Sequence, residues 1–231
     1  NTISGLSAWT KQWNSITWYC IKDTRGIRGN RIRAGAERGQ VQDMDGLKGN
    51  RKMSGKLIYD GGAEECEQDT VLTEPREFWD GKILMELPSG FAEMEEERKA
   101  AYFPYGKRPE IMMEDREEDV RLTLQLLENG KGNGDVYGTA MEVGRLVKET
   151  FPQYGQSVVH LAEDGGSGLP CGWFLLNMKD IRSEHMKAVF LPEDGKLLLL
   201  TVTYPKGTCV KWREVCGYIR RSVRARTDGR K

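Results

Sequence analysis

Histidine is nearly absent from this chain, which has only His160 and His185 among its 231 residues. Neither lies in a metal-binding spacing such as H-E-x-x-H, and no two of the five cysteines form C-x-x-C. We therefore expect no metal, no cofactor and no catalytic residue, and structural or surface positions for both histidines. One alternative stays open, an unrecognised hydrolase in which Cys171 and His185 pair across adjacent strands, although no third group is evident to orient them.

Long apolar runs are also missing. No stretch approaches the roughly 20 apolar residues that a membrane-spanning helix needs, and no secretory signal peptide is visible. The odd number of cysteines without paired spacing favours reduced thiols and a cytoplasmic protein. The chain begins with Asn1 rather than Met, so a missing start, and with it secretion, stays open.

Charge is balanced in total but not along the chain. Lysine and arginine number 35, as do aspartate and glutamate. Residues 1–56 are basic and rich in glycine, so we expect a disordered arm, followed by an acidic linker at 57–77 that has room for one short strand, and a basic tail at 225–231. The arm and tail could bind nucleic acid or another polyanion, or the arm could be a solvated tail or no natural part of the protein. The residues of the polyanion alternative are Arg25, Arg28, Arg31, Arg33, Arg220, Arg221, Arg224 and Arg226.

Residues 78–224 carry the pattern of one α+β domain. Val120, Leu122 and Leu124 alternate with polar residues, as in a half-buried strand, whereas Val136, Ala140 and Val143 recur at helical spacing. The whole pattern predicts an antiparallel-rich β-sheet flanked by helices. We expect strands at 83–87, 110–114, 120–126, 157–162, 171–178, 184–191 and 196–204, and helices at 93–102, 136–151 and 209–224.

Four short motifs give this domain a family resemblance. They are Leu87-Pro-x-Gly-Phe91, Tyr102-Phe-Pro104, Arg108-Pro-Glu-Ile111 and Gly172-Trp-Phe174. With the order of the elements, they resemble the PsbP-like α/β/α sandwich superfamily (PsbP, DcrB and Eag-adaptor-like proteins), and most closely a set of uncharacterised bacterial proteins from Firmicutes. The resemblance implies a non-enzymatic protein that binds other proteins, and it supplies no active site to carry over.

The best candidate site in the sequence is the loop at 102–109. Tyr102, Tyr105 and Arg108 are residue types that anchor protein interfaces. The alternative is that the aromatic residues, Phe103 above all, simply hold the preceding helix on the sheet. We therefore expect a protein-binding module, an adaptor or chaperone for a secreted or assembled partner, which docks on this loop or on one face of the sheet.

Overall fold

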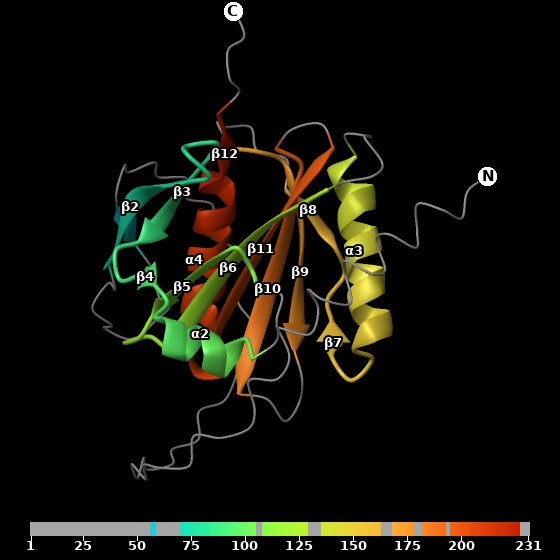
Figure 1. The fold of residues 1–231 in the computed structure, drawn as a ribbon. Helices are drawn as coiled ribbons and strands as arrows, with labels where there is room; N and C mark the ends of the chain where they lie inside the picture. The colour runs from blue at the N-terminus through green and yellow to red at the C-terminus, as the bar shows by residue number, and fades with distance from the viewer. Residues whose placement is uncertain are drawn as a thin grey trace, which may run out of the picture.

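The computed structural model describes residues 56–58, 70–104, 108–128, 135–162, 168–177, 182–192 and 195–226. Within these ranges two antiparallel sheets and three α-helices form a layered α+β sandwich, which confirms the predicted fold class (Figure 1). The predicted disordered arm lies outside the described residues, except for Lys56, which begins a strand. No helix in the described part of the chain is long and apolar enough to cross a membrane.

The smaller sheet has four strands and the larger has eight. In spatial order the smaller sheet consists of β1 (Lys56–Ile58), β2 (Thr70–Phe78), β3 (Ile83–Pro88) and β12 (Arg224–Ala225). The larger consists of β4 (Ala92–Glu93), β5 (Ile111–Asp115), β6 (Val120–Glu128), β11 (Lys196–Pro205), β10 (Ser183–Phe190), β9 (Cys171–Asn177) and β7 (Gly155–Gln156), with β8 (His160–Ala162) also paired to β9. The helices are α2 (Glu96–Tyr102), α3 (Val136–Thr150) and α4 (Cys209–Ser222), and a 3-10 turn, η2 (Lys206–Thr208), precedes α4.

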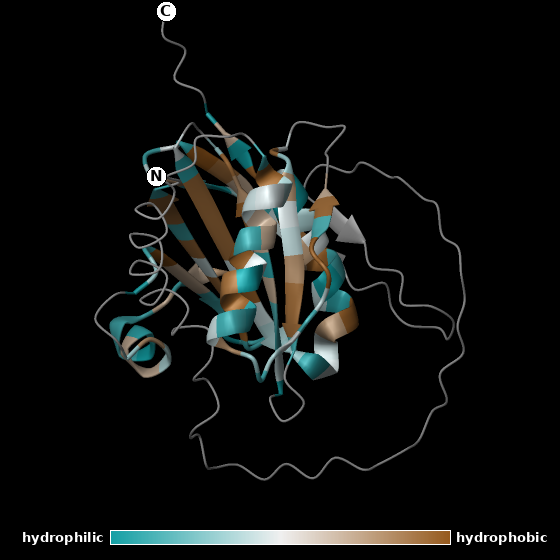
Figure 2. Ribbon diagram, turned by 90° about the vertical axis from the view of Figure 1, so that its right-hand side faces the viewer, coloured by the Kyte–Doolittle hydropathy of each residue, from teal (hydrophilic) through white to brown (hydrophobic). Residues whose placement is uncertain are grey.

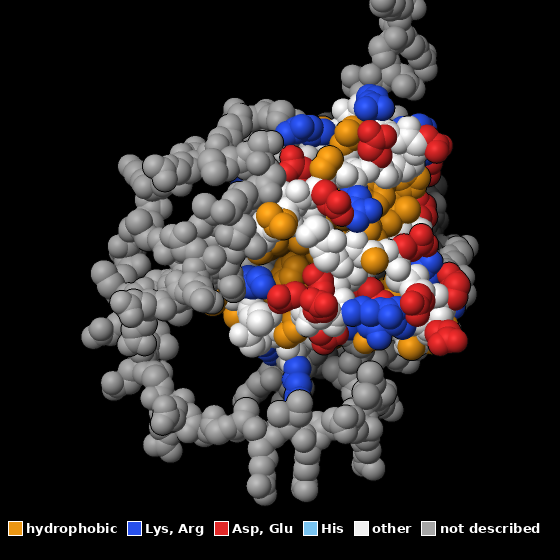
Figure 3. Space-filling model, turned by 90° about the vertical axis from the view of Figure 1, so that its left-hand side faces the viewer, with side chains coloured by type: hydrophobic (Ala, Val, Ile, Leu, Met, Phe, Trp, Pro, Cys, Tyr) orange, Lys and Arg blue, Asp and Glu red, His pale blue; other side chains and the backbone are white. Residues whose placement is uncertain are grey.

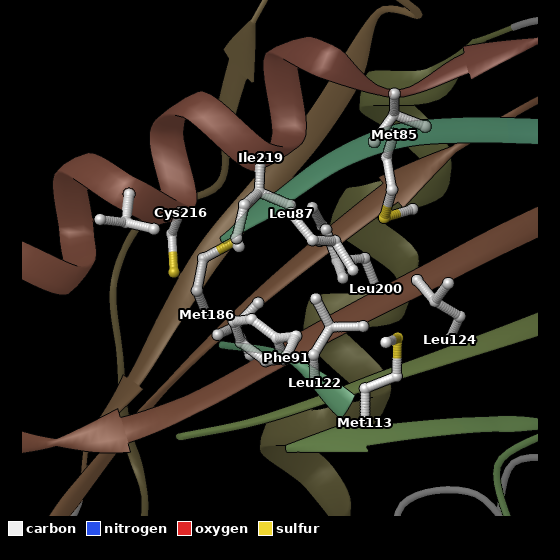
Figure 4. Close-up of a cluster of buried hydrophobic side chains, with 14 of the residues drawn as sticks. Met85, Leu87, Phe91, Met113, Leu122, Leu124, Met186, Leu200, Cys216 and Ile219 are labelled. Atoms are coloured by element: carbon white, nitrogen blue, oxygen red, sulfur yellow. The ribbon is translucent and has the colours of Figure 1, made fainter. Parts of the chain in front are cut away.

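The large sheet is buried on both faces. In β11, the run from Leu197 to Leu200 is buried without a break, because alternate side chains enter two different cores. On one face α4 and the small sheet cover the strands. Met85 and Leu87 of β3 and Ile219 of α4 meet Leu200 there (Figure 4). On the other face lie α3 and α2, so the sheet is the middle layer.

α3 lies unusually close to β9. A Cβ atom added at Gly172 would lie 2.3 Å from the Cβ of Ala140, so only glycine permits this approach. The helix has an apolar face toward the sheet and a polar face toward solvent (Figure 2). Asp135 caps its N-terminus, because its carboxylate accepts a hydrogen bond of 2.8 Å from the backbone N–H of Gly138.

α4 is held on the opposite face by apolar and ionic contacts. Trp212 is buried against Phe91, with ring centroids 6.1 Å apart in an edge-on arrangement. Glu184 of β10 accepts two hydrogen bonds from Arg213, of 2.7 and 2.6 Å, and a third of 2.6 Å from the Tyr204 hydroxyl. A buried carboxylate needs such partners, so this cluster fixes where α4 sits on the sheet.

Two expectations about element boundaries were wrong. Part of the predicted linker at 57–77 is the nine-residue strand β2, which pairs with β3 from Thr73 to Phe78. Pro75 argues against a strand by sequence, but it is tolerated because β1 covers only the first part of β2, at Thr70–Leu72. The first helix begins at Glu96 instead of residue 93, since Glu93 is paired in β4, and Ala101 faces solvent.

The close packing at Gly172 yields the first prediction. Gly172→Ala should lower the free energy of unfolding by about 1–3 kcal/mol, because α3 or β9 must shift to make room for the methyl group. Urea unfolding measures this. Gly207→Ala is the matched control, since nothing lies within 4 Å of a Cβ at that position. Equal shifts of the unfolding midpoint in the two variants would contradict the close approach of α3.

Candidate functional site

The predicted loop residues hold α2 against the sheet. The guanidinium carbons of Arg121 and Arg98 lie 4.2 and 5.2 Å from the centroid of the half-buried Tyr102 ring. Arg108 donates from Nε to the carbonyl oxygen of Phe103 at 3.0 Å. Phe103 itself is buried with Met94 and Met112, as the structural alternative expected. Tyr105 lies outside the described residues, and a partner-binding role for Tyr102 and Arg108 stays a prediction.

Charges around α2 compensate one another. Glu114 of β5 accepts two hydrogen bonds, of 2.7 and 2.6 Å, from Nε of Arg98, and Lys99 pairs with Glu93 at 2.8 Å. Acidic and basic side chains accordingly lie next to each other on this side of the molecule (Figure 3). The pair of Lys99 with the exposed Glu93 contributes little to stability, about 0–1 kcal/mol, whereas the carboxylate of Glu114 is buried and needs its arginine partner. Within the described residues, the basic side chains of this surface are thus paired with acidic ones.

The predicted pair of Cys171 and His185, on which the hydrolase alternative depends, does not form. Cys171 is opposite Phe190 in the β9–β10 register, whereas His185 is opposite Leu176, five positions along the strand. Cys171 belongs to the core under α4, and Leu176 to the core under α3. Because directly opposed residues share a face, Cys171 and His185 point to opposite sides of the sheet. Among the described residues, no three His, Cys, Asp or Glu side chains are grouped so as to hold a metal ion.

A set of buried polar side chains lies on the α3 side of the central strands, and the sequence analysis did not identify it as a group. In one cross-strand row Arg121 and His185 flank Thr203, and in the next Thr123 and Lys187 flank Thr201. The Nδ1 atom of His185 is 2.9 Å from the Thr203 hydroxyl, and Lys187 donates to the Thr201 hydroxyl at 3.1 Å. The signal was present as polar residues at alternate positions of two otherwise apolar strands.

His185 is held neutral in this set. Burial, and then the positive charges of Lys187 and Arg121, lower its pKa to about 3. Its ring lies 6.0 Å from that of Tyr154, and within the described structure Nε2 has no hydrogen-bond partner. A buried imidazole in this state does not exchange protons with solvent near neutral pH, so the geometry does not support a general base here.

The exposed apolar residues point to a different surface. Four of the six large hydrophobic residues that are exposed in the described structure gather where α3 meets the sheet edge. Tyr137 and Met141 lie on the same side of α3 as Gly144, the residue that approaches Val159 of the edge segment. Leu161 is opposite Gly172, beneath the same part of α3. We call this surface the edge patch; its members are Tyr137 (43% exposed), Met141 (46%), Val158 (73%) and Leu161 (42%).

A β-bulge creates part of the edge patch. Between the Gln156–Leu176 pair and the His160–Trp173 pair, the edge segment has three residues but β9 has two. Val159 fills the place that faces α3, because it lies near Gly144. The extra residue, Val158, is therefore turned out to solvent.

The other face of β8 carries an aromatic and basic stack. The ring of His160 stacks on that of Trp173, with centroids 4.4 Å apart and planes tilted by 22°. The guanidinium carbon of Arg220, from α4, lies 4.5 Å from the centroid of Trp173. Nη1 of Arg220 is buried and has no hydrogen-bond partner in the described structure. The sheet edge at β8 thus has an apolar side toward α3 and a basic side toward α4.

Only four of the eight arginines of the polyanion alternative lie within the described residues. Arg25, Arg28, Arg31 and Arg33 lie outside the described residues. Of the remaining four, Arg220 stacks on Trp173, Arg226 pairs with Glu77 at 3.6 Å, and both Arg221 and Arg224 are exposed. Nucleic-acid binding by these residues stays a prediction.

Comparisons with known proteins give similarity of structure at low sequence identity. No protein-family model and no curated protein sequence matches the chain. The solution structure of cyanobacterial PsbP (CyanoP) from Synechocystis sp. PCC 6803 is similar over 72% of this chain and 98% of that chain, with 12% identity and a TM-score of 0.49. A crystal structure from Bacteroides thetaiotaomicron VPI-5482 is similar over 65% of this chain and 47% of that chain, with 12% identity and a TM-score of 0.43.

A third solved structure is that of LpqN, described as involved in cell envelope biogenesis of Mycobacterium tuberculosis. It is similar over 68% of this chain and 92% of that chain, with 14% identity and a TM-score of 0.39. A PsbP structure is thus among the matches. Similarity at this level says nothing about function, and the expected closeness to Firmicutes proteins stays a prediction.

Burial of neutral His185 predicts a pH dependence of stability. In the unfolded chain the pKa of His185 is about 6.5, so the unfolded state binds a proton as the pH falls below this value. In the folded state the pKa is about 3, so the same proton is not bound between pH 6.5 and pH 3, and stability falls in this range. From pH 7 to pH 5 the wild type should lose about 2 kcal/mol more unfolding free energy than His185→Gln. Urea unfolding at both pH values checks this, with the exposed His160→Gln as control. The same pH slope in wild type and His185→Gln would contradict it.

Proposed function

We propose that this chain is a non-enzymatic protein-binding module, an adaptor or chaperone, which docks its partner on the edge patch. The observation that carries the proposal is the gathering of Tyr137, Met141, Val158 and Leu161 at one place on the described surface. Single exposed apolar residues are ordinary, but a contiguous group marks an interaction surface. A partner secreted by, or assembled in, the cell is consistent with such a role.

The residue types suit a docking surface. Tyrosine and methionine are enriched in protein interfaces, where the ring supplies area at low entropic cost and the thioether adapts to the shape of the partner. The close contact between Gly172 and Ala140 fixes α3 on β9. The side chains of Tyr137 and Met141 therefore project from a rigid helix. A rigid support lowers the entropic cost of binding.

The size of the edge patch limits the affinity that it can provide alone. Covering the exposed parts of four such side chains contributes on the order of 3–6 kcal/mol, since full burial of one large apolar side chain is worth about 1.5–3. A micromolar complex needs about 8 kcal/mol. The partner must therefore make further contacts beside the edge patch.

Site-specific photo-crosslinking tests the proposal. A photoreactive amino acid replaces Met141 in one variant and Leu161 in another, and the full chain is expressed in the cell from which the sequence comes. We expect both positions to crosslink to one and the same protein, because both side chains lie in the edge patch.

Val210 is the matched control, since it is an exposed apolar residue of α4 outside the edge patch. Photoreactive Val210 should not yield the same product. Absence of a product at both test positions, equal labelling at Val210, or crosslinking only to a second copy of this chain would contradict the proposal. Unfolding midpoints equal to that of the wild type confirm that the variants are folded.

A further inference from the structure

β8 leaves one side of its backbone open. It pairs with β9 on its inner side, and within the described ranges no strand pairs with its outer side. An extended segment can add to such an edge through main-chain hydrogen bonds. Successive side chains of the added strand would then point alternately toward the α3 face and the α4 face of the sheet.

The two faces next to β8 demand different side chains. On the α3 face, Leu161, Tyr137 and Met141 form an apolar wall. On the α4 face, His160 and Trp173 stack, and the guanidinium of Arg220 lies over the indole. An apolar side chain fits the first face, and a carboxylate fits the second because the positive charge of Arg220 attracts it.

A second arginine lies close to the same end of the edge. The backbone N–H of Leu169, two residues before β9, donates to the carbonyl oxygen of Val223 at 2.8 Å, and exposed Arg224 follows Val223. Ala162, the last residue of β8, is opposite Cys171 at the start of β9. Arg220 and Arg224 thus place positive charge on the α4 side of the edge.

We infer that the partner presents an extended segment of alternating apolar and acidic residues, which adds to β8 as a further antiparallel or parallel strand. This inference rests on the proposed function and names the chemistry of the partner. Because β8 has only three residues and is preceded by a bulge, main-chain bonds are few. Which segments bind to β8 therefore depends on their side chains, and segments with other side chains bind poorly to this edge.

Synthetic peptides test the inference with the full-length chain. The probe is a fluorescent eight-residue peptide that alternates valine and glutamate. One control peptide alternates valine and lysine, and another has four valines followed by four glutamates. By fluorescence anisotropy we expect the alternating acidic peptide to bind about tenfold more tightly than either control, since only it satisfies both faces.

Variants assign the two faces separately. Arg220→Gln should weaken binding of the alternating acidic peptide about tenfold, because it removes a positive charge from the α4 side of the edge. Met141→Glu should weaken it at least as much, and Val210→Glu should leave it unchanged. The peptide should also slow hydrogen exchange of the amides in His160–Ala162, which side-chain contacts alone would not do. If Arg220→Gln does not fold, His160→Ala replaces it.

Equal binding of the three peptides, or undiminished binding to Arg220→Gln, would overturn the inference. So would binding without slowed exchange in β8. If photo-crosslinking at Met141 and Leu161 captures one partner while the alternating acidic peptide fails, the proposed function stands and the strand inference falls. If crosslinking fails as well, both fall.

Discussion

The large sheet has to be covered on both faces, and the other layers follow from this requirement. β11 is apolar at nearly every position from Leu197 to Tyr204, so neither of its faces can remain in water. α4 and the small sheet cover one face, and α3 covers much of the other. The hydrogen-bonded cluster at Glu184 and the close approach at Gly172 fix these two layers at definite places. The edge patch lies where the exposed side of α3 meets the edge of this sheet.

Much of this architecture could be predicted from the sequence, because the strongest signals are periodic. The alternation in β6, the helical spacing in α3 and the uninterrupted apolar run in β11 each identify their element. Asp135 is a residue type that favours the N-cap position, and it marks the start of α3. β2 was missed because its pattern is mixed with charges and with Pro75, and only its pairing with β3 makes it a strand. Pairing over a distance leaves little trace in local sequence.

The site could be predicted far less well, for a physical reason. Tyr102 and Arg108 are residue types common in interfaces, but the same properties let them stack and donate within the molecule, and here they hold α2. Tyr137 and Met141 were missed because an exposed apolar residue on a helix looks like any other until the edge strand is placed beside it. Trp173 and Arg220 are 47 positions apart, and no sequence pattern connects them. A surface made of several elements is defined only after folding.

The bulge at Val158 sets which side of the sheet each later residue of the edge occupies. Upstream of it Gln156 lies on the α3 side, and without the extra residue Leu161 would be on the α4 side and His160 on the α3 side. The apolar and basic characters of the two faces therefore depend on chain length at one point, not only on residue identity. A substitution at this edge therefore leaves the orientation of its neighbours unchanged, whereas the gain or loss of a single residue at the bulge would exchange the two faces.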